Sequence, residues 1–135
     1  MTKEISRRGY LLDTHIALFS MSQSKSLSAA ARGAVASGAN VLSVVSYWEV
    51  VIKTMKGKLD VGDPREWWLR ALDHLAARPL ALNPNHVAGV TALPPLHRDP
   101  FDRALIAQAM VEGLTLVTAD AEIALYASAG LRVVV

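Results

Sequence analysis

Short runs of apolar residues recur along this chain, separated by polar stretches with the composition of helices. A strand with one face in water alternates apolar and polar residues, so runs that are apolar throughout predict strands buried on both faces. Such runs are "YLL" (10–12), "NVLSV" (40–44), "LTLVT" (114–118) and "LRVVV" (131–135), with "PLALN" (79–83) as a shorter fifth. The alternation of these strands with helices predicts an α/β fold whose central, mostly parallel sheet of four to five strands is covered on both faces.

The stretches between the strands carry helix start and stop signals. The clearest helix is 63–78, which opens with Asp and then Pro, the usual cap and first-turn pair. Helix 26–38 is expected to be capped by Ser26 or Ser28 and to end at Gly38. Further helices are predicted over 14–21, from about 46 to 56, and over 84–93, 99–112 and 119–129. We find no repeat or linker and expect one domain over 1–135, with a loose polar tail over 1–9.

The composition excludes several classes of protein. With 52% hydrophobic and 19% charged residues the chain is expected to be globular. It has no cysteine, which excludes a disulfide scaffold and cysteine-ligated zinc. No signal peptide or apolar run of about 18 residues is present, so we expect a cytoplasmic protein with no membrane partner. The net charge of +2 permits a nucleic-acid partner without arguing for one.

Acidic residues follow the predicted strands. Asp13 comes directly after the first strand, Asp120 shortly after the 114–118 strand, and Glu49 lies one turn into the helix that follows the second strand. In an open parallel sheet, ligands bind outside the carboxyl ends of the strands, where the strand order reverses. We therefore expect these three acids at one edge of the sheet, with Asp102, at the start of its helix, as a fourth.

Each of these acids also has a purely structural interpretation. Asp13 and Asp120 suit the N-caps of the helices that follow them. Glu49 has Lys53 four residues later, the favourable order for an ion pair on a helix surface. These interpretations stay open for each acid taken alone.

Asp102 is the most ambiguous of the four. Asp99, Pro100 and Asp102 resemble a capping box, and "DPRE" at 63–66 has the same plan. Against this, Asp102 shares its helical face with apolar residues three, four and seven positions later, the side that packs on the sheet. An acid that serves only as a cap is expected to face water.

Four acids in one pocket would repel one another. A pair of carboxylates about 4 Å apart costs on the order of 4 kcal/mol at an effective dielectric constant near 20. The acids must therefore be partly protonated, or a cation must neutralise them. Ligands that are all oxygen favour Mg²⁺ or Mn²⁺ over zinc.

The segments that hold these acids resemble those of a known family. "LLDTH" (11–15), "SYWEVVIK" (46–53), "LPPLHRDPFDRALIAQA" (93–109) and "LVTAD" (116–120) are similar, in this order, to PIN-domain ribonucleases, in particular VapC-type toxins of toxin–antitoxin pairs. The resemblance implies a PIN-like three-layer α/β/α sandwich. It also implies that Asp13, Glu49 and Asp102 are catalytic metal ligands and that Asp120 is the fourth, more variable one.

The resemblance further implies an endoribonuclease that hydrolyses phosphodiester bonds with one or two Mg²⁺ or Mn²⁺ ions. RNA would be its substrate, a small antitoxin protein its partner, and a homodimer its expected assembly. The alternative is a non-catalytic RNA-binding or protein-interaction module whose acids serve as helix caps. Chelation of metal separates the two, because only the nuclease would lose its function.

Other residues are candidates for supporting roles. Thr14, Ser46 and Thr118 could orient the acids or a water, and Asp99 could assist them or only cap its helix. Glu122 is a candidate further acid, and Arg103 could line the rim of the acidic pocket. The candidate RNA contacts are Lys53, Lys56 and Arg98, although a single lysine is more often an ordinary solvated side chain. His15 and His97 lack metal-ligand spacing and are interpreted as structural or surface residues. Trp48 lies on one helical stripe with Val45 and Ile52, which predicts a core position.

Overall fold

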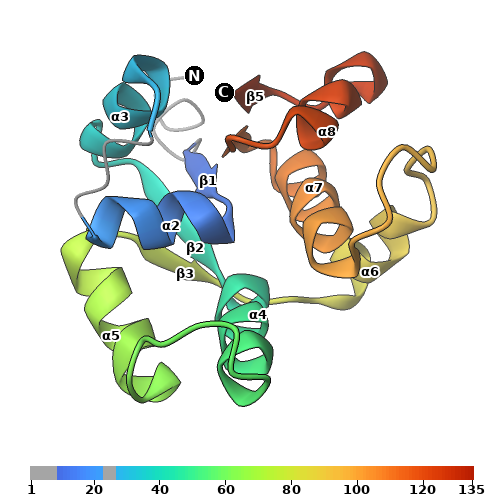
Figure 1. Ribbon diagram of the computed structural model, residues 1–135. Helices are drawn as coiled ribbons and strands as arrows, with labels where there is room; N and C mark the ends of the chain where they lie inside the picture. Colours follow the sequence, from blue (N-terminus) through green and yellow to red (C-terminus); the bar gives the residue numbers. More distant parts are fainter. Residues whose placement is uncertain (1–8, 23–26) are drawn as a thin grey trace.

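A parallel five-stranded sheet forms the centre of the computed structural model, which describes residues 9–22 and 27–135 (Figure 1). Its order is β3-β2-β1-β4-β5, and every neighbouring pair is parallel. The strand order reverses between β1 and β4, and Asp13 and Asp120 follow these two strands. The strands are β1 (Tyr10–Leu12), β2 (Asn40–Ser43), β3 (Arg78–Leu80), β4 (Thr115–Val117) and β5 (Val133–Val134).

Helices cover both faces of this sheet, which confirms the three-layer α/β/α sandwich. Successive strand residues point to opposite faces, so Leu11 joins one apolar cluster and Leu12 the other. This explains why the strands are apolar throughout. The helices are α2 (Thr14–Met21), α3 (Ala29–Ala36), α4 (Val44–Met55), α5 (Pro64–His74), α6 (Pro84–Val90), α7 (Pro100–Glu112) and α8 (Ala121–Ala124), followed by a 3-10 turn, η1 (Leu125–Ala129).

Helix α5 ends at His74, four residues earlier than predicted. The cause is Ala76, which has a φ of 48°, in the left-handed region. The Ala77 N–H donates to the Leu72 carbonyl at 2.9 Å and the Ala76 N–H to the Asp73 carbonyl at 3.1 Å, as in a Schellman motif. This ending usually carries glycine, so an alanine gives no signal of it.

Two other predicted boundaries change. Helix α4 begins at Val44 because the Ser43 hydroxyl caps it, accepting from the Val45 N–H at 3.0 Å. Gly9, predicted to belong to a loose tail, is buried, and its carbonyl accepts from the Thr115 N–H at 3.0 Å. Residues 1–8, the rest of that predicted tail, lie outside the described residues.

The other predicted helix caps are Ser26 or Ser28 for α3 and Asp63 for α5. Ser28 caps α3, whereas Ser26, the other predicted cap, is not among the described residues. Asp63 caps α5 as predicted. Within residues 9–22 and 27–135, no helix combines the length and the apolar character needed to cross a bilayer.

The prediction that Trp48 is a core residue is wrong. Its side chain is 55% exposed, and its ring contacts the edge of Phe101 at a centroid distance of 5.1 Å. The buried face of α4 instead includes Ser46 and Glu49. The side of the helix that faces the protein interior is therefore rotated away from the stripe of apolar residues that contains Trp48. Those two polar residues point toward the acidic edge of the sheet, which an apolar pattern does not reveal.

Candidate active site

Asp13 is placed by the end of strand β1. Its side chain is only 3% exposed and caps α2, accepting from the Ile16 N–H at 2.8 Å. Its other oxygen accepts from the Thr118 hydroxyl, which follows the neighbouring strand β4. Burial raises the pKa of Asp13, and the Thr118 hydrogen bond opposes this only in part. Asp13 is thus both a helix cap and part of a buried acidic edge.

Glu49 enters the same edge from α4 and is 2% exposed. One carboxylate oxygen lies 2.6 Å from the Thr14 hydroxyl, which is itself 3.0 Å from the Ser46 hydroxyl. The other oxygen pairs with Lys53 Nζ at 2.8 Å. The predicted pair with Lys53 is therefore present, but Glu49 is buried, so this is not a pair of surface residues. Its negative charge adds to burial, the main cause, in raising the pKa of Asp13 and of Asp102.

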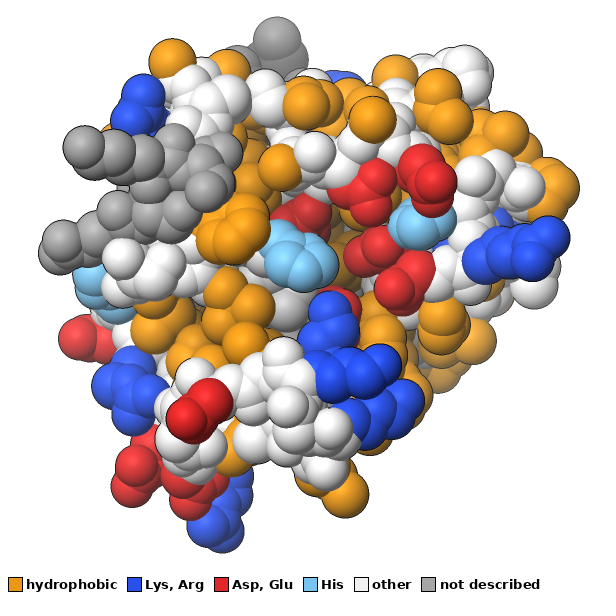
Figure 2. Space-filling view, viewed as in Figure 1, with side chains coloured by type: hydrophobic (Ala, Val, Ile, Leu, Met, Phe, Trp, Pro, Cys, Tyr) orange, Lys and Arg blue, Asp and Glu red, His pale blue; other side chains and the backbone are white. Residues whose placement is uncertain are grey.

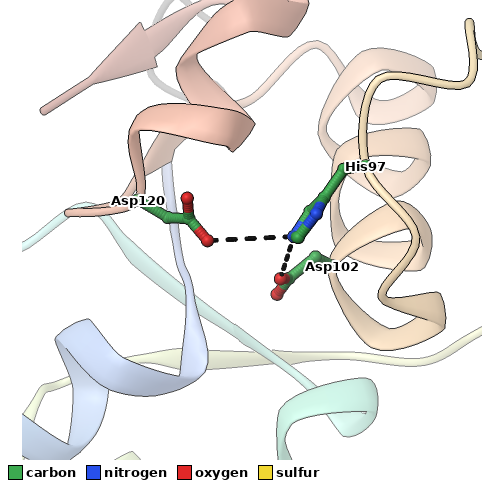
Figure 3. Close-up of side chains that lie close together, drawn as sticks. All are labelled: His97, Asp102 and Asp120. Atoms are coloured by element: carbon green, nitrogen blue, oxygen red, sulfur yellow. Dashed lines mark hydrogen bonds and ion pairs between the residues drawn. The ribbon is translucent and has the colours of Figure 1, made fainter.

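Asp102 stands in the first turn of α7, where Asp99 is the N-cap and accepts from the Phe101 N–H at 2.8 Å and the Asp102 N–H at 3.2 Å. The Asp102 carboxylate points toward His97 and Asp120 (Figure 3). Burial, followed by the charges of Asp99 and Glu49, raises the pKa of Asp102 to about 6, although a hydrogen bond from His97 opposes the shift. Asp99 caps the helix, and Asp102 faces the acidic edge.

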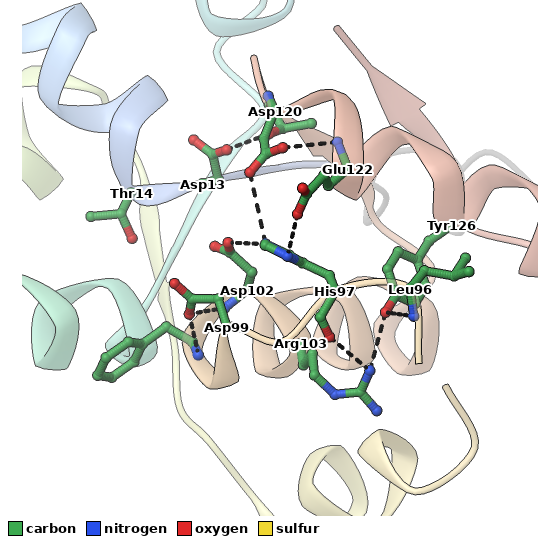
Figure 4. A network of polar contacts seen from close by, with 12 residues as sticks. Asp13, Thr14, Leu96, His97, Asp99, Asp102, Arg103, Asp120, Glu122 and Tyr126 are labelled. Atoms are coloured by element: carbon green, nitrogen blue, oxygen red, sulfur yellow. Dashed lines mark hydrogen bonds and ion pairs between the residues drawn. The ribbon is translucent and has the colours of Figure 1, made fainter. Parts of the chain in front are cut away.

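Asp120 and Glu122 come from the turn after β4. Asp120 caps α8 by accepting from the Glu122 N–H at 2.8 Å, and its own N–H donates to the Thr118 hydroxyl at 3.0 Å. Thr118 therefore ties the turn that carries Asp120 to the carboxylate of Asp13. Glu122 Oε2 lies 2.7 Å from His97 Nδ1 (Figure 4).

His97 occupies the middle of this group, so the surface interpretation of this residue is wrong. Its Nε2 lies 2.7 Å from Asp102 Oδ2 and 3.8 Å from Asp120 Oδ2. Ligand atoms of His97, Asp102 and Asp120 all fall within 4.8 Å of one another, close enough to share one ion. Burial lowers the pKa of His97, but the hydrogen bond to Asp102 and the surrounding carboxylates outweigh it and raise the pKa above its ordinary value.

The predicted basic residues divide into two kinds. Arg103 turns away from the acids and donates to the carbonyls of Pro94 at 3.1 Å and His97 at 3.3 Å and to the Tyr126 hydroxyl at 3.1 Å. It holds the loop before α7 and does not line the rim. Lys56 and Arg98 are exposed, and Lys53 is half-buried. In Figure 2, acidic side chains surround a histidine in a hollow, and a patch of Lys and Arg side chains lies directly below them.

The family assignment rests on a match that covers most of the chain. A model of the PIN domain matches residues 10–129. The chain belongs to the PIN domain family. No curated protein sequence is significantly similar to it.

Solved structures share this PIN fold. A toxin–antitoxin complex from Klebsiella pneumoniae contains a chain that is 18% identical, with a TM-score of 0.63, covering 94% of this chain and 97% of that one. FitAcB from Neisseria gonorrhoeae is 18% identical with a TM-score of 0.62, covering 92% and 95%. VapBC2 from Rickettsia felis, bound to a DNA fragment from its promoter, is 16% identical with a TM-score of 0.63, covering 93% and 96%.

The side chains present suit the divalent metal that PIN domains typically use. Carboxylate oxygens of Asp13, Asp102 and Asp120 come from three elements to one edge, and hard divalent cations prefer oxygen ligands. Burial makes the ionised forms of Asp13 and Asp102 unfavourable, so a bound cation would stabilise both. The donor set therefore fits a hard divalent cation.

Proposed function

We propose that this PIN domain is a metal-dependent endoribonuclease and the toxin of a toxin–antitoxin pair. The observation that carries the proposal is the gathering of Asp13, Glu49, Asp102 and Asp120 at the carboxyl edge of β1 and β4. These acids are far apart in the sequence. Helix capping accounts for Asp13 and Asp120 but not for the buried Glu49 or for the direction of Asp102.

Asp13, Glu49 and Asp102 would hold the one or two ions, with Asp120 as the fourth ligand. When bound, a divalent ion polarises the scissile phosphodiester and offsets the charge of the leaving oxygen. Thr118 keeps the Asp13 carboxylate directed at the site, and Thr14 does the same for Glu49. Asp102 or Asp120 would orient the attacking water and accept its proton on a carboxylate oxygen.

The proposed substrate is RNA, which meets the site through its phosphates. Lys56 and Arg98 are exposed, and the half-buried Lys53 forms an ion pair with Glu49 in which Nζ and the carboxylate oxygen are 2.8 Å apart. Cations beside an acidic pocket attract the flanking phosphates, while the ion neutralises the scissile one. This arrangement favours a phosphodiester substrate over a neutral one.

The proposed partner is a small antitoxin, since one of the similar solved structures named above is a toxin–antitoxin complex. A groove of about 480 Å³ lies between α2 and the segment 58–70, and Lys53 lines both this groove and the acidic site. Leu18, Phe19 and Trp67 give it an apolar floor. The proposed homodimer finds support in exposed apolar side chains on α4, Trp48 at 55% and Met55 at 79% exposure.

The test is cleavage of total RNA by the purified protein with Mg²⁺ or Mn²⁺. We expect cleavage by the wild type, its loss with EDTA, and its loss in Asp102→Asn. The matched control is Glu66→Gln, which alters an exposed acid at the corresponding place in the "DPRE" helix start of α5 and should cleave normally. Equal cleavage by wild type and Asp102→Asn would refute the proposal. RNA binding that survives EDTA, without cleavage, would instead identify the acids as caps in a binding module.

A further inference from the structure

The imidazole of His97 lies where an ion held by Asp102 and Asp120 would need a further ligand. Its Nε2 is 2.7 Å from Asp102 Oδ2 and 3.8 Å from Asp120 Oδ2. Neighbouring ligand atoms around an octahedral ion with bonds of about 2.1 Å lie about 3 Å apart. The first separation is close to that spacing and the second is wider, so the Asp120 side chain would have to move toward His97 to admit an ion.

The other ring nitrogen of His97 is already engaged. Nδ1 pairs with Glu122 Oε2 at 2.7 Å, while Nε2 forms a hydrogen bond with Asp102 Oδ2. When an ion takes the place of the hydrogen bond to Asp102, the ring proton would lie on Nδ1 beside Glu122, and the Nε2 lone pair would face the ion. Histidines that bind metal almost always donate their second N–H to a carboxylate or a carbonyl, which fixes the ring and makes the ligand more basic.

The backbone at His97 is held in place as well. Arg103 donates to the carbonyls of Pro94 and His97. The Tyr126 hydroxyl accepts from the Leu96 N–H at 3.2 Å and donates to the Pro94 carbonyl at 2.8 Å (Figure 4). The loop that carries the imidazole is thus positioned by two buried or half-buried side chains outside the acidic cluster.

We propose that His97 Nε2 is a direct ligand of the divalent ion, beside Asp102 and Asp120, and that Glu122 is the positioning carboxylate behind it. This deepens the proposed function and rests on its metal centre. Imidazole suits transition metals, whereas Mg²⁺ prefers oxygen ligands. A centre with this imidazole ligand therefore prefers Mn²⁺ to Mg²⁺ more strongly than a site made only of carboxylates does.

A rival interpretation gives His97 the opposite role. A protonated imidazole would pair with Asp102 and Glu122 in the place of the ion and would have to leave before the ion binds. Removing the ring would then strengthen Mn²⁺ binding, because a competing cation disappears. If His97 is a ligand, removing it weakens binding, so the two interpretations predict effects of opposite sign.

The experiment measures Mn²⁺ binding by electron paramagnetic resonance, with no RNA and no turnover. Pulsed spectra of the wild-type complex should show hyperfine coupling to a directly bound imidazole nitrogen. His97→Ala should lose that coupling and bind Mn²⁺ about tenfold more weakly or worse, with a smaller loss for Mg²⁺ measured by competition. Glu122→Gln should keep the coupling and bind Mn²⁺ more weakly. His74→Ala, which removes an exposed histidine in the last turn of α5, should match the wild type.

The outcomes separate this inference from the function on which it rests. Mn²⁺ bound to the wild type without nitrogen coupling, or bound as tightly by His97→Ala, would overturn the role of His97. If Asp102→Asn still abolished binding in that case, the carboxylate centre would stand. Failure of the wild type to bind Mn²⁺ would overturn both. The wild-type spectrum needs no substitution, so the test does not depend on a variant that folds.

Discussion

Replacing Asp102 by asparagine should make the metal-free protein more stable at neutral pH, although it removes a proposed ligand. The pKa of Asp102 rises from 3.8 to about 6, first because of burial and then because of the Asp99 and Glu49 charges. A shift of about 2 units corresponds to about 3 kcal/mol of free energy of unfolding. Asparagine is neutral and similar in shape, so it avoids most of this penalty.

The pH dependence of this gain follows from the sign of the shift. The folded state keeps the Asp102 proton at pH values where the unfolded chain has already released it, so the wild type loses stability as the pH rises from about 4 to about 6. Asp102→Asn does not titrate there. The advantage of the variant should be small at about pH 4 and reach its full value, on the order of 1 to 3 kcal/mol, above about pH 6.

Urea unfolding in EDTA at about pH 4 and about pH 8 measures this difference, with Glu66→Gln as the control. Mn²⁺ should then stabilise the wild type and leave Asp102→Asn almost unchanged, since an ion that binds only the folded state adds to its stability. A variant no more stable than the wild type at pH 8, or equally favoured at both pH values, would refute the idea that the buried charge is unfavourable without an ion.

Three further predictions concern the scaffold, and urea denaturation measures each. Arg103→Ala should lower the free energy of unfolding by about 2 kcal/mol, because carbonyls of the loop before α7 lose a charged donor, and an unchanged value would contradict its anchoring role. Ala76→Gly should raise it by roughly 0.5 to 1 kcal/mol, since glycine adopts a φ of 48° without strain, and a loss would count against the left-handed helix end. Trp67→Ala should cost about 3 to 5 kcal/mol and Trp48→Ala less than about 1, and similar costs would mean that Trp48 is buried after all.

The fold was predictable because its signals are local. A strand buried on both faces leaves a continuous apolar run, and Leu11 and Leu12 illustrate how such a run supplies two cores. The end of α5 was not predictable, because the left-handed residue there is Ala76 and only glycine or asparagine would have signalled it. Similarly, the apolar stripe through Trp48 was misleading, since the buried face of α4 is partly polar.

The acidic edge was predictable from topology, since acids that follow parallel strands end at one side of a sheet. His97 was missed because its partners are set by the path of a loop. Asp102 is close in the chain, but Glu122 meets the ring only because the turn after β4 passes over the start of α7. Arg103 was predicted to lie at the rim of the acidic pocket because it is charged, whereas its N–H groups donate to carbonyls of the loop before α7.

The most direct test of the account is anomalous diffraction from crystals of the wild-type protein soaked with Mn²⁺. We expect an anomalous peak about 2.2 Å from carboxylate oxygens of Asp13, Asp102 and Asp120, at the carboxyl edge of β1 and β4. A saturated crystal with no peak among these carboxylates, or with Mn²⁺ only at unrelated surface acids, would contradict it.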